Sequence, residues 1–286
     1  MSKQADPEVI SSVVVFCRDV LVPAAAEIDA REIFATKHRA GLAALGLFGQ
    51  NLPEEYGGAG IDPWTQFETI ALIAGACAST ASMVTAHYLA TDSILYGGSA
   101  EQKARWLPGA ASGELVGAFA LTEPGAGSNP ADMTTTAREE ADGYRLTGTK
   151  HFISNAAAAD FIVVYAKTDP AAGARGISAF AIDPKAPGVQ IGANEPTMGL
   201  RGGHVFEVNL DCLAPKDARL GPAGSGFRTA LKTLDAGRLD IAACCVGIAE
   251  AAYSAAQDWT RQRKIGGMPL SEYQGIQWMI ADMATE

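Results

Sequence analysis

The hydrophobic period of this chain changes twice, and this limits the folds that it can adopt. Residues 1–114 are rich in alanine and repeat their apolar side chains every three or four positions, as amphipathic helices do. From Leu115 onward, short runs of β-branched and aromatic residues follow, divided by Gly, Pro and Asp. The helical period returns at Gly226 and continues to Glu286. This order of blocks predicts an α+β protein.

The same changes of period predict three domains. We expect an N-terminal all-α domain over residues 1–114, a middle β domain over residues 115–222 and the first part of a C-terminal α domain over residues 223–286. The middle domain should be antiparallel, because no segment of helix length separates its strands. The last helix shows no C-cap signal, so we expect an incomplete C-terminal helical bundle with apolar surface exposed.

Local signals fix some of the helix ends and faces. Asp6 before Pro7 predicts the start of the first helix, and Ser99 should cap a short helix that Pro108 closes. In the helix that starts at Gly226, an apolar stripe is expected to face the core. Its members are Phe227, Leu231, Leu234, Arg238, Ile241, Cys245, Ile248 and Ala252.

Composition excludes several classes of function. The net charge of −10 disfavours nucleic-acid binding. The five cysteines are odd in number and lack CxxC spacing, and the four histidines are scattered, so we expect neither disulfides nor a metal site. No secretory signal heads the chain, and its apolar runs are too interrupted to cross a membrane, so we expect a cytoplasmic protein.

The stretch of residues 119–128, FALTEPGAGS, carries the most chemical information. A strand ends there in a turn that holds Gly125 and Gly127, flanked by the hydroxyls of Thr122 and Ser128. Backbone N–H groups that such glycines free can face a phosphate or a polar ring edge. Taken alone, the spacing favours an ordinary β-turn, because short glycine-rich loops are common.

Several stretches together resemble the acyl-CoA dehydrogenase family. The turn resembles its flavin-binding signature, and residues 148–155, GTKHFISN, resemble the strand that lies against the flavin. Residues 45–60, 98–108 and 234–238 are similar to further family motifs and occur in the family's order, so that the resemblance covers essentially the whole chain.

The resemblance implies FAD as cofactor and identifies its contacts. Ser154 would hydrogen-bond flavin N5, and Phe152 stands where the family usually has a tryptophan. Arg263 and Gln274 would reach the FAD of a neighbouring subunit. The sequence departs from the family at Gly266, where a phenylalanine is usual, and at Asn129, where an aspartate is usual. The full set of cofactor contacts is Phe119, Leu121, Thr122, Gly127, Ser128, Phe152, Ile153, Ser154, Arg263 and Gln274.

The resemblance also implies a substrate side formed by Ser128, Asp235 and Arg238. Arg238 and Asp235 lie one helical turn apart, so a purely structural ion pair is an equally compatible interpretation. A carboxylate must remove the substrate α proton. A minority of the family places this glutamate at the position that Gly237 occupies here. Because glycine has no carboxylate, that arrangement is excluded. We therefore expect the base beyond Glu286, and we set aside Asp235 and Asp240.

The family's activity is the FAD-dependent conversion of an acyl-CoA thioester to trans-2-enoyl-CoA, as in the β-oxidation of fatty acids. Electrons then pass to an electron-transfer flavoprotein, and the family usually forms tetramers, so we expect a homo-oligomer, either a tetramer or a dimer. Two alternatives stay open. One is a flavin oxidase or monooxygenase of the same fold. The other is a non-catalytic partner subunit of a heteromeric dehydrogenase.

Overall fold

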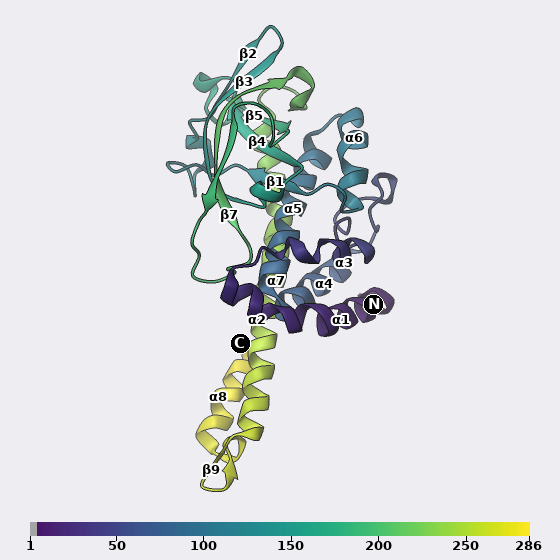
Figure 1. The fold of residues 1–286 in the computed structure, drawn as a ribbon, viewed down its shortest axis with the longest axis vertical. Coiled ribbons are helices and arrows are strands. Elements are labelled where there is room, and N and C mark those ends of the chain that lie inside the picture. The colour runs from purple at the N-terminus through teal and green to yellow at the C-terminus, as the bar shows by residue number, and fades with distance from the viewer. Residues whose placement is uncertain (1–4) are drawn as a thin grey trace.

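The computed structural model describes residues 5–286 and confirms the α+β fold class (Figure 1). Its N-terminal part is helical, and α5 runs through the centre of the molecule with most of its residues buried. The helices of this part are α1 (Pro7–Phe16), α2 (Val22–Arg31), α3 (Arg39–Ala44), α4 (Pro63–Ala76), α5 (Ala78–Gly97) and α6 (Ala100–Ala111).

The predicted helix starts are confirmed, and one predicted end is wrong. The Asp6 carboxylate accepts the N–H groups of the first turn of α1, which continues into α2 through a π-helical turn. Ser99 and Gln102 form a capping box at the start of α6. Pro108 does not close α6, which runs on to Ala111. Burial of Leu107, Ala110 and Ala111 on one face holds the last turn together despite the missing N–H group.

The middle part is one eight-stranded sheet in the order β6-β7-β3-β2-β4-β5-β8, with β1 paired to β4. Most pairs are antiparallel, as predicted. β1, however, is parallel to β4, so the prediction of a purely antiparallel sheet is wrong at this pair. The two strands can be parallel because the β2–β3 hairpin lies between them in the chain. The strands are β1 (Gly117–Ala120), β2 (Thr136–Glu140), β3 (Gly143–Ser154), β4 (Phe161–Lys167), β5 (Ile177–Ile182), β6 (Val189–Asn194), β7 (Val205–Pro215) and β8 (Arg219–Leu220).

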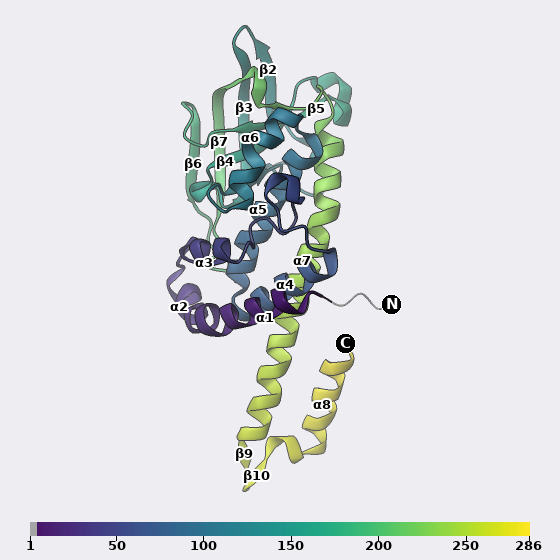
Figure 2. The same ribbon diagram turned by 90° about the vertical axis from the view of Figure 1, so that its right-hand side faces the viewer.

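The C-terminal part is an arm. Helix α7 (Gly226–Gln262) passes along α5 and α4 and continues beyond the body of the molecule, and α8 (Gln274–Thr285) runs back beside it (Figure 2). The turn between them holds the short strands β9 (Lys264–Ile265) and β10 (Met268–Pro269). Apolar side chains are exposed along the arm, as expected: Trp259 is 62% exposed and Trp278 is 63% exposed.

The packing face of α7 confirms part of the predicted stripe, since Phe227 and Leu234 pack against the core, and corrects the rest. Leu231, Ile241 and Ile248, members of the predicted stripe, are 42–56% exposed. The buried face instead consists of small or polar residues, which let α7 approach its neighbours at backbone distance. A Cβ added at Gly247 would lie only 1.9 Å from the carbonyl oxygen of Ala71 on α4. The buried residues of α7 are Gly226, Thr229, Ala230, Thr233, Gly237, Asp240, Ala243 and Gly247.

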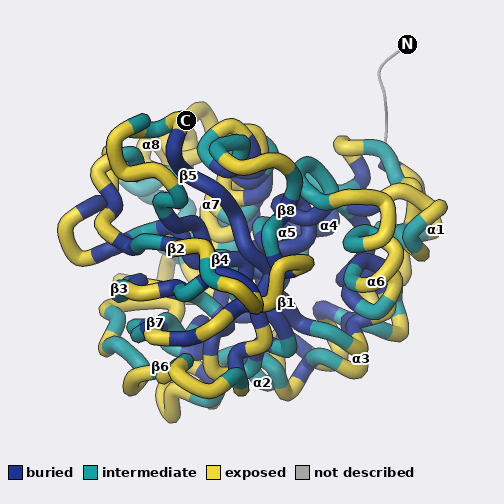
Figure 3. Tube along the Cα trace, turned by 90° about the horizontal axis from the view of Figure 1, so that it is seen from above, coloured by how far each residue is buried: buried dark blue, intermediate teal, exposed yellow. Residues whose placement is uncertain are grey.

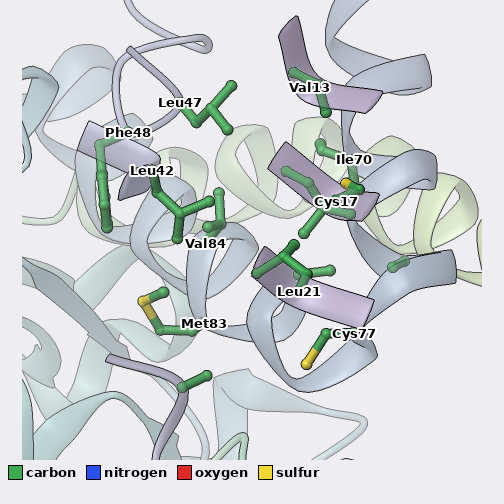
Figure 4. Packing of buried hydrophobic residues seen from close by; sticks show 14 of the residues in the cluster. Val13, Cys17, Leu21, Leu42, Leu47, Phe48, Ile70, Cys77, Met83 and Val84 are labelled. Atoms are coloured by element: carbon green, nitrogen blue, oxygen red, sulfur yellow. The ribbon is translucent and has the colours of Figure 1, made fainter. Parts of the chain in front are cut away.

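Three hydrophobic clusters hold these parts together. One lies among the N-terminal helices, where Val13, Cys17 and Leu21 face Ile70 of α4 (Figure 4). A second fills one face of the sheet. The third joins the other face to α5, α6 and α7, so the sheet is fixed to the helices through its core. Seen from above, buried backbone concentrates around α5, α7 and the central strands (Figure 3).

Two helical stretches are long and apolar enough to span a membrane by length and composition alone, namely Pro7–Arg31 and α7. This finding differs from the expectation that every apolar run is too interrupted to cross a membrane. Core helices of soluble proteins and signal sequences pass the same test. Both stretches pack against α4.

Candidate functional site

The turn that follows β1 presents free backbone donors. Glu123 and Ala126 exchange two N–H···O=C bonds of 3.1 Å each, which closes a tight loop around Pro124 and Gly125. Within residues 5–286, the N–H groups of Gly125, Gly127 and Ser128 donate to no protein acceptor. No atom lies within 4 Å of the Cβ position of either glycine, so this side of the turn is open. The turn can therefore bind an anionic or polar group through its backbone.

Strand β3 turns an aromatic ring outward at the same place. Its pairing with β7 shifts register between Lys150 and Ile153, which is a β-bulge. Phe152 lies in this bulge with φ of 56° and is 60% exposed. A phenylalanine rarely adopts a positive φ, and such strain concentrates at functional sites. Ile153 points inward and is 1% exposed.

Asn155 anchors the end of β3 and was not assigned a role from the sequence. It also has a left-handed backbone, with φ of 66°. Its buried side-chain amide donates a hydrogen bond of 2.8 Å to the carbonyl of Met83 on α5. This bond ties the bulged strand to the central helix.

A buried ion pair joins the turn to β3. Lys150 Nζ lies 2.8 Å from Glu123 Oε1 and donates a second hydrogen bond of 3.1 Å to the Leu121 carbonyl. Glu123 Oε2 accepts the Thr134 hydroxyl and N–H, at 2.8 and 2.6 Å. Burial raises the pKa of Glu123, but the Lys150 ammonium and the hydrogen bonds outweigh this effect and lower the pKa to about 2. The alternation Tyr144, Leu146, Gly148, Lys150 places Lys150 inward, a signal that could have revealed the pair from the sequence.

The structure thus brings eight of the predicted cofactor residues to one region. The N–H of His151 donates a bond of 2.9 Å to the Thr122 carbonyl, which sets the bulge beside the turn. Leu121 and Ile153 are buried and the Phe119 ring packs 5.2 Å from Tyr165, so these three offer only backbone groups. The remaining five are at least partly exposed: Thr122, Gly127, Ser128, Phe152 and Ser154.

The two substrate-side residues on α7 form an exposed pair. Arg238 Nη1 lies 2.5 Å from Asp235 Oδ1, and their side chains are 73% and 68% exposed. The predicted helix face implied that Arg238 is a buried charge. In the structure its side chain is exposed, so no desolvation cost arises. Between them, Gly237 is buried, and a Cβ there would lie 2.6 Å from Leu89 Cδ2. A side chain at this position requires Leu89 to move.

Arg263 and Gln274 lie elsewhere. Both are exposed at the turn of the arm, at the opposite end of the molecule from the sheet (Figure 1). The structure does not bring them to the other predicted residues of the same chain. Their role toward a neighbouring subunit stays a prediction, as does the effect of Gly266, which adopts φ of 60°.

A cavity of about 370 Å³ lies between α4, α5, α7 and the loop at residues 50–53, and none of the predicted cofactor residues lines it. Two buried carboxyl groups line it. Burial raises the pKa of Asp92 to about 7 and that of Asp240 to about 6. Asp240 is 4% exposed and lies on the face of α7 opposite Arg238. This separates Asp240 from the substrate-side pair, as the sequence indicated.

Family models match the chain along nearly its whole length. The acyl-CoA dehydrogenase N-terminal domain model matches residues 4–114, the middle domain model residues 118–212 and the C-terminal domain model residues 224–286. The chain belongs to the acyl-CoA dehydrogenase family. It is an oxidoreductase by this membership, and the turn and bulged strand described above lie within the matched middle domain.

Individual acyl-CoA dehydrogenases are similar over most of the chain. Human mitochondrial short-chain specific acyl-CoA dehydrogenase is 40% identical over 97% of this chain and 69% of its own length. The structure of butyryl-CoA dehydrogenase from Megasphaera elsdenii superposes with a TM-score of 0.96 at 34% identity, covering 100% of this chain and 77% of that one. The structure of a glutaryl-CoA dehydrogenase from Mycobacterium smegmatis in complex with FADH2 superposes with a TM-score of 0.91 at 30% identity. The match covers 97% of this chain and 71% of that one. The chain therefore spans about 69% of the human relative.

Proposed function

We propose that this protein is an FAD-dependent dehydrogenase of short-chain acyl-CoA thioesters that forms the trans-2-enoyl-CoA. The observation that carries the proposal is the pairing of the open turn at residues 121–128 with the bulged end of β3, where Phe152 is turned outward. The short-chain preference rests on the similarity to short-chain and butyryl-CoA dehydrogenases.

The residues present fit FAD. Among residues 5–286, three backbone N–H groups of the turn have no protein acceptor, and the hydroxyl-bearing side chains of Ser128, on the turn, and Ser154, at the end of β3, are at least partly exposed. Such a donor set suits a pyrophosphate and the polar edge of a flavin ring. The exposed Phe152 ring supplies an apolar surface against which a flat ring packs. When bound, the flavin supplies a hydride acceptor for the substrate β carbon.

The chain's own residues bind and orient the reactants. The Ser154 hydroxyl would donate a hydrogen bond to the flavin, at the edge where charge develops in the transition state. Asp235 and Arg238 line the substrate side with exposed charges of both signs. We assign no residue among 5–286 to removal of the α proton. Gly237 has no carboxylate, and Asp240 is buried on the opposite face of α7.

Partners and location follow from the same proposal. Electrons would pass to an electron-transfer flavoprotein, and Arg263 and Gln274 of the arm, which are exposed, would contact the cofactor of a second copy in a homo-oligomer. We propose a cytoplasmic location, with fatty acid β-oxidation as the metabolic setting.

An anaerobic titration tests the function. The purified chain, reconstituted with FAD, is titrated with butyryl-CoA while the visible spectrum is recorded. Bleaching of the flavin band supports dehydrogenation. Bound flavin that no short-chain acyl-CoA bleaches contradicts dehydrogenation by this chain, and failure to bind FAD contradicts the cofactor assignment as well. Rapid oxygen consumption by the reduced protein favours the oxidase alternative.

A further inference from the structure

We propose that the buried Lys150–Glu123 ion pair positions the flavin site by setting the spacing between the turn at residues 121–128 and the bulge of β3. The inference rests on the proposed function, because it concerns how the same cofactor site is held in shape. Lys150 and Glu123 are positioning residues, since both side chains lie behind the site surface.

The pair connects three segments that are separate in sequence. Lys150 comes from β3, two residues before the exposed Phe152. Glu123 belongs to the turn, and its carboxylate also binds Thr134 and Thr135 at the entry to β2. The Lys150 side chain has no exposed surface and that of Glu123 is 2% exposed. One buried centre therefore joins the turn, the bulged strand and the start of β2.

Every oxygen of the carboxylate has a partner. Oε1 accepts Lys150 Nζ at 2.8 Å and the Thr135 N–H at 3.0 Å. Oε2 accepts both donors of Thr134. A buried ion pair is a weak source of stability, because apolar side chains of similar volume fill the same space without desolvating charges. A buried ion pair in which the carboxylate and the ammonium both have hydrogen-bond partners instead specifies one geometry. We therefore expect this pair to determine precision more than stability.

The pair acts directly on the groups that face the cofactor. The backbone of Glu123 exchanges both hydrogen bonds with Ala126, so fixing Glu123 fixes the loop that carries the free N–H groups. Lys150 also binds the carbonyl of Leu121 at 3.1 Å, which holds the strand leading into the turn. If the pair is lost, the turn and the bulge can move apart by small distances while the fold persists.

The test uses the double variant Lys150→Met with Glu123→Gln in the full chain. This variant removes both charges, keeps their approximate volume and avoids leaving one buried charge unpaired. The control is Arg138→Met with Glu140→Gln, which removes the pair on neighbouring β2, where the arginine side chain is 77% exposed. FAD affinity is measured by quenching of flavin fluorescence, the bound flavin by its visible spectrum, and apoprotein stability by its thermal midpoint.

We expect the double variant to keep the apoprotein midpoint within a few degrees while its Kd for FAD rises at least tenfold and the resolved bands of the bound flavin broaden. The control should leave both unchanged. A double variant that folds and binds FAD like the wild type overturns the inference. If wild-type chain binds no FAD, the proposed function fails instead.

A milder variant covers the case in which the double variant does not fold. Thr134→Val keeps the ion pair but removes one of the bonds that orient the Glu123 carboxylate. The expected result is a two- to fivefold rise in the Kd for FAD with an unchanged apoprotein midpoint. An unchanged Kd in this variant also contradicts a positioning role.

Discussion

Asp240 on α7 accepts a hydrogen bond of 2.9 Å from Gln66 Nε2 on α4, across 174 residues of sequence. The carboxyl group lines the cavity between α4, α5 and α7 together with Asp92 of α5, which accepts a hydrogen bond of 2.8 Å from Asn51 Nδ2. Burial raises the pKa of both groups, and the proximity of Asp240 adds to the rise at Asp92. Asp240 thus joins α7 to α4, and Asp92 joins α5 to the loop at Asn51, and burial raises the pKa of both acids toward neutral pH.

This arrangement predicts that the stability contributed by the two acids falls as pH rises from about 4 to about 7. In the unfolded chain both carboxyls ionise near their ordinary pKa of 3.8, whereas in the folded chain they keep protons up to about pH 6 and 7. Asp92→Asn with Asp240→Asn should remove this dependence and raise the free energy of unfolding at about pH 8 by roughly 1–3 kcal/mol. Urea unfolding at several pH values measures both effects.

The control for this experiment is Asp235→Asn, whose side chain is 68% exposed. It should leave the pH profile of stability unchanged. If the double variant shows the same pH profile as the wild type, the two acids do not titrate as the structure indicates.

The backbone of Phe152 predicts a separation of stability from cofactor binding. Glycine adopts a φ of 56° without the steric cost that phenylalanine bears. Phe152→Gly should therefore leave the apoprotein as stable or stabilise it by up to about 1 kcal/mol. The same change should raise the Kd for FAD at least tenfold, because the exposed ring is lost. Leu200, with φ of 54° and 44% exposed, provides the control. Leu200→Gly should relieve strain equally and leave FAD affinity unchanged.

The crossing of α7 and α4 predicts intolerance to a single methyl group. At Gly247 an added Cβ would meet the Ala71 carbonyl at 1.9 Å, and backbone atoms cannot rotate away. Gly247→Ala should destabilise the protein by about 1–3 kcal/mol. Gly275→Ala on α8, where no atom lies within 4 Å, should instead stabilise its helix by up to about 1 kcal/mol. Chemical denaturation compares the two variants, and equal effects would show that the crossing is looser than described.

The exposed Asp235–Arg238 pair predicts a functional effect without a structural one. Exposed ion pairs stabilise a protein by less than about 1 kcal/mol, so Asp235→Asn with Arg238→Met should scarcely change the free energy of unfolding. If the pair contacts the thioester ligand, the Kd for butyryl-CoA should rise about tenfold, measured by calorimetry. Glu27 and Arg31, an exposed pair on α2, supply the matched control, which should alter neither quantity. If the variant with both substitutions binds butyryl-CoA with unchanged affinity, the pair does not contact the ligand.

Much of the fold follows from local signals in the sequence. Asp6 and Ser99 reveal helix starts because capping is a short-range hydrogen-bond effect. Pro108 misleads because tertiary burial of the last turn of α6 outweighs the lost N–H bond. The parallel pairing of β1 with β4 has no local signal, since it depends on the intervening hairpin.

The candidate site was foreseen through its motifs, but its internal support was not. The glycines and hydroxyls of the turn are visible in the sequence, whereas the bulge that turns Phe152 outward appears only in the pairing of β3 with β7. On α7, hydrophobicity identified the packed side only in part, because Leu231, Ile241 and Ile248 are exposed. Small residues such as Gly247 allow closer approach than leucine or isoleucine, so size rather than hydrophobicity selects the packed side.

The two parts of helix α7 should differ in how strongly their amide hydrogens are protected from exchange with solvent. All of its buried residues lie between Gly226 and Gly247, whereas α8 has none. Amide hydrogens in the first half should exchange only when the whole protein unfolds, and those beyond Gly247 through brief local opening of the arm. A single uninterrupted helix thus belongs to two cooperative units, and a probe such as Trp259 reports on the weaker one.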